Sequence, residues 1–174
     1  MSHHFISDLH LQSSHPRTSA AFLSFLEHHA QYAQALYLLG DLFEYWIGDD
    51  ILDDDPFAAR MAALMHTFSE RGIALYVMHG NRDFLIGERF TSATGAKLLQ
   101  DPTLLDLHDI PTLLMHGDTL CTDDVKYLAF RKKVRDPAYQ AQFLAQPLAA
   151  RKQVIAGLRA ENAEEKQQKS DAIM

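Results

Sequence analysis

The stretch LYLLGDLFEYWIGDD, Leu36–Asp50, begins with apolar residues and becomes polar at Gly40 and Asp41. A short apolar run that ends at a glycine is typical of a strand buried on both faces of a sheet. Helical patterns lie on either side of it, SAAFLSFLEHHAQYA at 19–33 and DPFAARMAALMHTFSERG at 55–72. Strands that alternate with helices predict an α/β fold with crossover connections and a largely buried sheet.

Local signals predict the remaining elements. We expect further strands at 4–7 and 73–80. The helix that follows the central strand has Asp55 as a candidate N-cap and Gly72 as a stop. The segment AKLLQDPTLLDLHDIPTLLMHG, 96–117, is expected to hold short strands that include an antiparallel pair. After residue 122 the chain is predicted to be helical, interrupted by its prolines.

Four strands of the predicted sheet end on residues that can bind a metal. Besides Asp41, the segment FISDLH ends at Asp8 and His10, LYVMHGN ends at Asn81, and TLLMHGD ends at His116. Ligands of open α/β sheets bind at the carboxyl ends of the strands. Carboxylate, amide and imidazole groups without a thiolate suit Mn²⁺, Fe²⁺ or Zn²⁺. The sequence therefore predicts a divalent metal centre, with Asp8 and His10 pointing the same way from extended backbone.

Each of these signals is weak alone, because Gly-Asp and Gly-Asn after a strand are common turns. Their joint occurrence in order favours metal binding over coincidence. His79 lies two residues before Asn81 and is a candidate for supporting the ligands without binding the metal. Lone histidines such as His28, His29, His66 and His108 are expected at the surface or in the core.

Length and composition predict one globular domain. The chain has 174 residues, of which 47% are apolar, enough for a core. No apolar run approaches the length of a membrane span, and no secretory signal precedes the first strand. The single cysteine, Cys121, cannot form an internal disulfide, which suits a reducing cytoplasm.

The charges are distributed unevenly along the chain. Residues 1–124 carry 6 Lys and Arg against 18 Asp and Glu, a net charge of −12, whereas residues 125–174 carry 10 against 5, a net charge of +5. The acidic part suits cations, and the basic part suits anionic ligands or a membrane surface. The acidic segment DDILDDDP, 49–56, is expected to be a solvated loop that binds no metal.

The motifs DLH, GD, GN and HG, in this order, resemble the calcineurin-like metallophosphoesterase superfamily. The resemblance implies an α/β sandwich of mixed sheets flanked by helices, with a helical lid insertion. It implies two metal ions, one held by Asp8, His10 and Asp41 and the other by Asp41, Asn81 and His116. In that superfamily the shared aspartate bridges the ions, and a bridging hydroxide attacks phosphorus.

The longer motifs FISDLHL, LLGDLFEYWIGDD, MHGNRDFLIG and LMHGDTLCTDD resemble the UDP-2,3-diacylglucosamine hydrolase family of lipid A biosynthesis. That resemblance implies cleavage of the pyrophosphate of a lipid-linked UDP-sugar to UMP and 2,3-diacylglucosamine 1-phosphate (lipid X), with two Mn²⁺ ions. Arg82 stands where many superfamily members have a histidine. Its planar fork matches phosphate oxygens, so Arg82 is expected to grip the pyrophosphate rather than to act as an acid. The resemblance implies Asp41 and Arg82 as the catalytic residues.

The same resemblance divides the chain into a phosphoesterase core at 1–121 and a basic and apolar lid at 122–170. It implies an acyl-chain groove formed by Tyr127, Phe130, Arg131, Phe143 and Leu144. An ordinary amphipathic helix pair remains an alternative for about half of the lid residues. The family resemblance also implies substrate contacts from six residues: Asn81, Arg82, Asp124, Asn162, Lys166 and Lys169.

His116 is the last histidine of the chain. The family has two further metal-binding histidines in a later GHTH-like segment, so the rest of the core is expected beyond residue 174. Two other functions stay open, a phosphoesterase for another substrate and a metal-poor binding module. The expected location is the cytoplasmic face of the inner membrane, held peripherally by anionic lipids. No nucleic-acid-binding module is recognisable, and no protein partner is evident.

Overall fold

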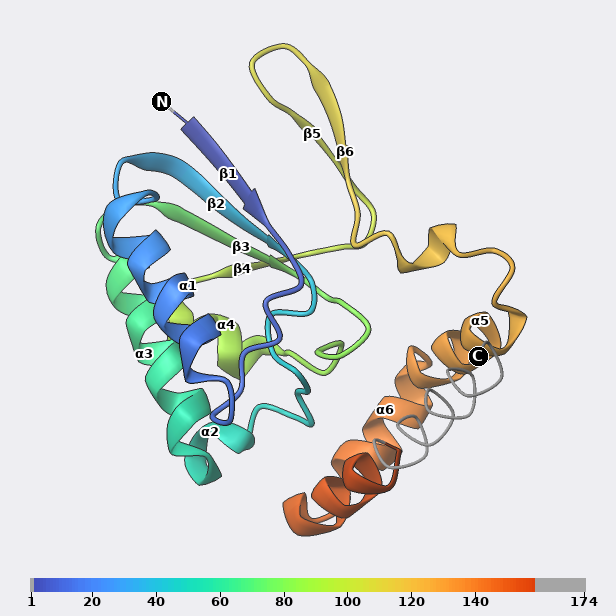
Figure 1. Ribbon diagram of the computed structural model, residues 1–174. Helices are drawn as coiled ribbons and strands as arrows, with labels where there is room; N and C mark the ends of the chain where they lie inside the picture. Colours follow the sequence, from blue (N-terminus) through green and yellow to red (C-terminus); the bar gives the residue numbers. More distant parts are fainter. Residues whose placement is uncertain (1, 159–174) are drawn as a thin grey trace, which may run out of the picture.

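A parallel four-stranded sheet lies at the centre of the computed structural model, which describes residues 2–158 (Figure 1). The strands are β1 (Ser2–Ile6), β2 (Ala33–Leu39), β3 (Ala74–Met78), β4 (Lys97–Leu99), β5 (Thr103–Asp106) and β6 (Pro111–Leu114). The α-helices are α1 (Pro16–His28), α2 (Ile51–Asp54), α3 (Pro56–Ser69), α4 (Glu88–Thr94), α5 (Val125–Val134) and α6 (Pro137–Leu144). Residues 148–158 are also helical, and η1 (Asp118–Leu120) is a short 3-10 turn.

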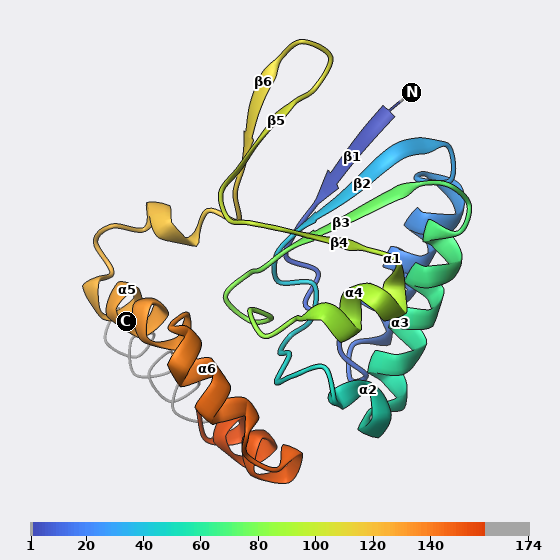
Figure 2. The same ribbon diagram turned by 180° about the vertical axis from the view of Figure 1, so that it is seen from behind.

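The spatial order of the main sheet, β1-β2-β3-β4, is also the order along the chain, and all three pairings are parallel. Right-handed crossovers that always proceed in one direction place their helices on one face. Helices α1, α3 and α4 accordingly cover the same face of the sheet (Figures 1 and 2). The predicted α/β class is confirmed. Within residues 2–158 this sheet is wholly parallel, and the antiparallel strands β5 and β6 form a separate hairpin.

The core lies between the sheet and these helices. Leu36 and Leu38 of β2 point toward the helices and are almost fully buried, together with Phe22 of α1 and Met65 of α3. The alternate β2 side chains face the other way. There the Tyr37 ring stacks between two neighbouring aromatic rings across the sheet. The central strand is therefore apolar on both faces, as its sequence predicts.

The predicted start and stop of α3 are confirmed. Asp55 accepts a hydrogen bond from the backbone N–H of Phe57 at 2.8 Å, and Gly72 has a φ of 84° just beyond the helix. Helix α1 begins earlier than predicted, because Pro16 occupies its first turn, where a missing N–H costs nothing. The antiparallel pair expected at 96–117 is the hairpin β5–β6, which projects from the sheet (Figure 1).

The prediction of a loop at 49–56 is wrong, although Asp50, Asp53 and Asp54 are exposed to solvent as predicted. Residues Ile51–Asp54 form the short helix α2, and Asp49 accepts hydrogen bonds from the indole of Trp46 and from the backbone of α4. Asp50 pairs with Arg151, whose side chain is only 2% exposed and also donates to the carbonyl of Ile47. The segment therefore joins the helix at 148–158 to the core.

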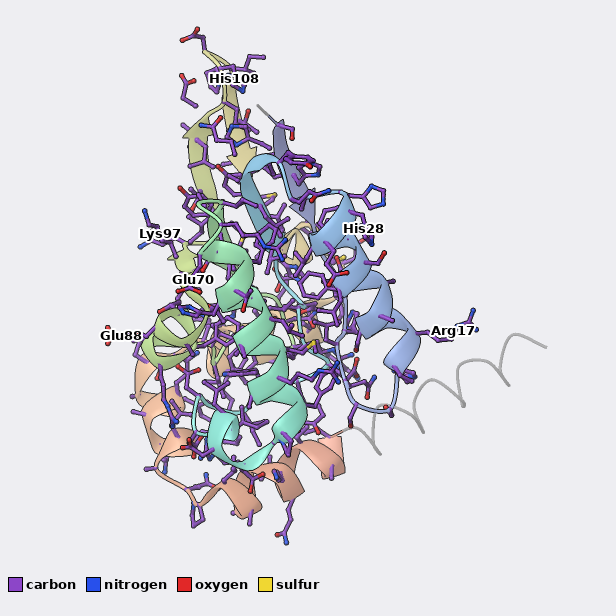
Figure 3. The ribbon with its side chains drawn as sticks, turned by 90° about the vertical axis from the view of Figure 1, so that its left-hand side faces the viewer. Arg17, His28, Glu70, Glu88, Lys97 and His108 are labelled. Carbon is purple, nitrogen blue, oxygen red and sulfur yellow. The ribbon has the colours of Figure 1, made fainter. Side chains whose placement is uncertain are left out.

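The helices after residue 122 lie beyond the carboxyl ends of the parallel strands (Figure 1). Their breaks fall at the prolines, since α6 begins at Pro137 and the next helix follows Pro147. No helix in residues 2–158 is long and apolar enough to cross a membrane. His28 and His108 are exposed, and Figure 3 places His108 at the tip of the hairpin, which confirms their surface position.

Candidate metal centre

The loops that follow β1 and β2 run side by side beyond the sheet. The backbone N–H of Asp8 donates to the carbonyl of Gly40 at 3.1 Å, and that of His10 donates to the carbonyl of Asp41 at 3.0 Å. A parallel bridge between Leu11 and residue 43 continues the pairing. These bonds fix the first two ligand loops relative to each other, independently of any bound ion.

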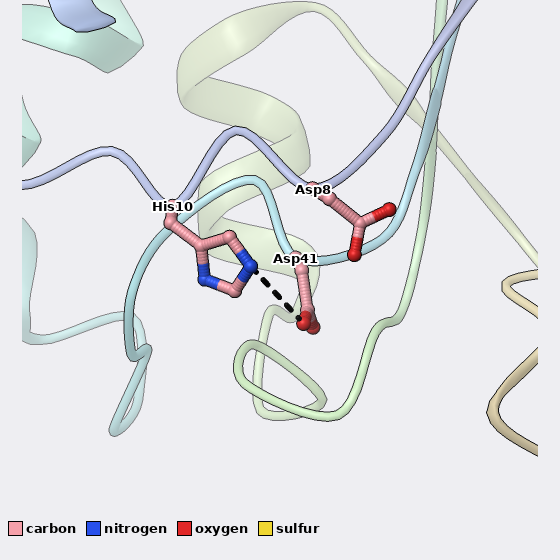
Figure 4. Close-up of side chains that lie close together, drawn as sticks. All are labelled: Asp8, His10 and Asp41. Atoms are coloured by element: carbon pink, nitrogen blue, oxygen red, sulfur yellow. Dashed lines mark ion pairs between the residues drawn. The ribbon is translucent and has the colours of Figure 1, made fainter.

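Asp8, His10 and Asp41 come together as predicted, but by a different backbone route. Their φ values are 56°, 48° and 52°, so all three adopt the left-handed conformation rather than extended backbone. Such conformations are costly for residues other than glycine and persist where the surroundings enforce them. One ligand atom from each lies within 4.8 Å of the others (Figure 4). Three left-handed residues on two neighbouring loops thus bring three donors to one point.

Asp41 lies between two imidazoles. Its Oδ2 is 3.7 Å from Nε2 of His10, and its Oδ1 is 3.8 Å from Nε2 of His116. The residue is 3% exposed, and burial raises the pKa of its carboxyl group, whereas the backbone N–H of Arg82 and the imidazoles lower it. A carboxylate with one oxygen toward each histidine has the geometry to bind two ions at once. Cations there would offset the cost of burying its charge.

A carbonyl oxygen orients His116, and a carboxylate lies close to His10. Nδ1 of His116 lies 2.9 Å from the carbonyl oxygen of Leu39, so it donates there and leaves Nε2 to bind a metal. Nδ1 of His10 lies 3.1 Å from Oε2 of Glu44. A carboxylate or carbonyl behind the far ring nitrogen is the usual support of a metal-binding histidine. Glu44 was not predicted from the sequence as a site residue, although it lies only three residues after Asp41.

Asp83 connects the loops that follow β2 and β3. It was not predicted from the sequence as a site residue. Its side chain is fully buried and accepts hydrogen bonds from the backbone N–H groups of Gly80 and Leu42, at 2.8 and 2.7 Å. In return, the carboxylate of Asp41 accepts from the backbone N–H of Arg82 at 2.9 Å. Burial raises the pKa of Asp83 to about 6. The signal for this residue was present in the GNRD motif, directly after Arg82.

The GNRD loop brings two predicted residues next to Asp41. Gly80 packs directly against Asp41 and the backbone N–H of Arg82 donates to its carboxylate, so the backbone of the intervening Asn81 lies nearby. Within residues 2–158 the guanidinium of Arg82 makes no ion pair, so it can meet an anion. His79 supports this loop from within, since its Nε2 lies 2.7 Å from the carbonyl oxygen of Ile86, and burial lowers its pKa.

The predicted lid residues occupy several environments. Tyr127 and Arg131 of α5 both bond Asp118, and Arg131 also pairs with Asp101. Asp124 caps α5 by accepting from the backbone N–H of Tyr127 at 2.9 Å. Phe143 packs against the core, whereas two other apolar side chains remain partly exposed, Phe130 at 44% and Leu144 at 41%. Asn162, Lys166 and Lys169 lie outside the described residues.

The family model of the calcineurin-like phosphoesterases matches residues 1–167. The chain belongs to this family. Curated relatives named UDP-2,3-diacylglucosamine hydrolase are 49% identical in Cellvibrio japonicus (strain Ueda107) and 51% identical in Escherichia coli O7:K1, over 98% of this chain and 70% of each relative. The relative of that name from Aromatoleum aromaticum is 51% identical over all 174 residues, again 70% of its length. By this similarity the chain is a member of the UDP-2,3-diacylglucosamine hydrolases.

Membership of this family implies a metal-dependent hydrolase with a divalent metal site. The donors on this chain fit such an ion. Asp8, His10 and Asp41 provide two carboxylates and one imidazole at one point, and His116 adds an imidazole on the other side of Asp41. Oxygen and nitrogen donors of this kind suit hard and borderline divalent cations.

Proposed function

We propose that this protein hydrolyses the pyrophosphate bond of UDP-2,3-diacylglucosamine to UMP and 2,3-diacylglucosamine 1-phosphate, in lipid A biosynthesis. The observation that carries the proposal is the name of the relatives, which are 48–51% identical over nearly the whole chain. The site itself supports it, because Asp41 has one oxygen toward each of two histidines and can serve two ions.

We propose Mn²⁺ as the resident ion, with Asp8, His10 and Asp41 at the first position and Asp41, Asn81 and His116 at the second. Two bound ions would supply hydroxide at neutral pH and neutralise charge on the reacting phosphates. The protein's own contribution is to position the metal-binding side chains. Hydrogen bonds to the backbone of the ligand loops hold the donors in place before substrate arrives. Much of the rate enhancement of such a site originates in this preorganisation.

Arg82 is proposed to bind the pyrophosphate, so Arg82→Lys is expected to lower kcat/KM by up to about 100-fold. Lysine keeps the charge but loses the two-pronged fork that matches phosphate oxygens. The variant should bind Mn²⁺ like the wild type, since only the backbone of Arg82 contacts Asp41. Steady-state kinetics with a metal titration test this, and an unchanged kcat/KM would remove Arg82 from the pyrophosphate site.

The lid segment, residues 122–170, is proposed to hold the acyl chains. Partly exposed apolar side chains support this role on α5 and α6, notably Phe130 and Leu144. Asp124 and the residues Asn162, Lys166 and Lys169 are proposed to contact the head group.

The decisive experiment compares hydrolysis of UDP-2,3-diacylglucosamine with that of the same UDP-sugar without acyl chains, both with Mn²⁺. We expect kcat/KM to be much higher for the acylated substrate. Equal values would favour a phosphoesterase for another substrate. Absence of both hydrolysis and Mn²⁺ binding would favour a metal-poor binding module.

We further propose that the protein acts in the cytoplasm, at the inner-membrane surface. The net charge of +5 in residues 125–174 supports attraction to anionic lipids, which contributes about 1 kcal/mol for each Lys or Arg near the surface. Sedimentation with anionic vesicles is expected to decrease as salt rises, because salt screens the charges. Vesicle binding that is insensitive to both salt and lipid charge would contradict this mechanism.

A further inference from the structure

Arg131 on α5 is bound to two buried carboxylates outside its own helix. Its Nε lies 2.7 Å from Oδ2 of Asp118, and its Nη2 lies 3.0 Å from Oδ2 of Asp101. The two carboxylate side chains are only 4% and 6% exposed, and the Arg131 side chain is 21% exposed. A pair of this kind has a defined geometry, because the guanidinium fork fixes direction as well as distance.

Both carboxylates belong to the surroundings of His116. The other oxygen of Asp101 accepts a hydrogen bond from the backbone N–H of His116 at 3.2 Å. Asp118 stands two residues after His116 and also accepts from the hydroxyl of Tyr127 at 2.5 Å. Arg131 therefore holds the loop of this proposed metal ligand through two separate contacts.

Arg135 follows one helical turn later and reaches the loop after β3. Its Nη2 donates to the carbonyl oxygen of Gly80 at 2.8 Å, and its guanidinium lies over the ring of Phe84. Gly80 directly precedes Asn81. Residues four apart lie on the same face of a helix, so one face of α5, continued by its C-cap residue Arg135, contacts the loops of both Asn81 and His116.

We propose that Arg131 and Arg135 are positioning residues for the second metal position, the one served by Asn81 and His116. The inference rests on the metal centre described under the proposed function. The first position has a different support, because the loops of Asp8 and His10 are held by backbone hydrogen bonds to the loop after β2. Loss of an α5 arginine is therefore expected to disturb the second position and spare the first.

The direction in which the affinity for Mn²⁺ changes distinguishes a positioning role of the arginines from a purely electrostatic one. If only charge acted, removing a positive group near a cation site would raise the affinity for the cation. If the arginine positions the ligand loops, its removal lowers that affinity, because the loops shift and buried carboxylates lose their partner. Loss of such a supporting partner typically lowers metal affinity by about 10- to 100-fold.

The test is a titration of the purified protein with Mn²⁺, in which electron paramagnetic resonance measures the free ion. His10→Ala marks the first position and His116→Ala marks the second. Arg131→Gln and Arg135→Gln are expected to weaken the position that His116→Ala removes, by about 10- to 100-fold, and to leave the other unchanged. Arg131→Gln in the His116→Ala background should cause no further loss.

Lys132→Gln is the matched control, because it removes the same charge from an exposed position on the same helix. It should bind Mn²⁺ like the wild type. Arg131→Lys keeps the positive charge but lacks the guanidinium fork. It replaces Arg131→Gln in the Mn²⁺ titration if near-UV circular dichroism shows that Arg131→Gln does not fold. Unchanged or tighter Mn²⁺ binding in the arginine variants, or a loss confined to the first position, overturns the inference. The readout is independent of hydrolysis, so a failed substrate assay would count against the proposed function alone.

Discussion

Asp41→Ala is expected to abolish hydrolysis, lowering kcat by more than about 1,000-fold. Loss of a residue that merely supports a metal ligand costs about 10- to 100-fold, and Asp41 is proposed to bind both ions itself. Its two oxygens lie 3.7 and 3.8 Å from Nε2 of His10 and of His116, so its loss removes one donor from each proposed position. Turnover of UDP-2,3-diacylglucosamine at saturating Mn²⁺ measures the effect.

A thermal melt distinguishes loss of the site from loss of the fold. Mn²⁺ binds the native state, so it should raise the Tm of the wild type and leave that of Asp41→Ala nearly unchanged. Asp53→Ala is the control, because Asp53 is an exposed carboxylate paired with Arg89 at the surface. It should retain both activity and the Mn²⁺-induced shift. Near-wild-type turnover by a folded Asp41→Ala protein would show that the bridging role is wrong.

The sequence could predict the strand ends because apolar runs and their polar stops are local features. Asp41 and Asp8 follow such runs, and the parallel pairing of β1 with β2 places their loops side by side. The route of the backbone could not be predicted. Asp8 and His10 converge through left-handed turns, a conformation that depends on hydrogen bonds to a loop about 30 residues away in the sequence.

The sequence also could not predict contacts between charged residues that lie far apart along the chain. The bonds of Arg131 to carboxylates 30 and 13 residues earlier in the chain could not be predicted from its place in the basic lid segment. Asp50 in the acidic stretch at 49–56 is exposed as predicted, but its pairing with a buried arginine about 100 residues later could not be predicted. Nothing in the local pattern of a charged residue identifies a partner that only the tertiary fold brings near.

Gly80→Ala is the second substitution with a large expected effect, since it should remove Mn²⁺ binding at the Asp41 carboxylate and activity together. A Cβ atom at residue 80 would meet Oδ1 and N of Asp41 at less than 3.0 Å, closer than real Cβ atoms come to other atoms. The contacted atoms lie in a loop tied down by the buried carboxylate of Asp83, so the strain cannot be relieved by rotating a flexible side chain. The two loops must separate instead, which moves Asp41 away from the ligands around it.

Gly157→Ala is the matched control for this prediction. Gly157 lies in the helix at 148–158, and a Cβ atom there meets nothing within 4 Å. Alanine should stabilise that helix by about 1 kcal/mol and leave kcat unchanged. The paired measurement is kcat and Mn²⁺ affinity for both variants, because the same methyl group is added to a tight and to an open position. Wild-type kcat and Mn²⁺ affinity in Gly80→Ala would show that the loops around Asp41 tolerate displacement, so close loop packing would no longer explain how the ligands are held.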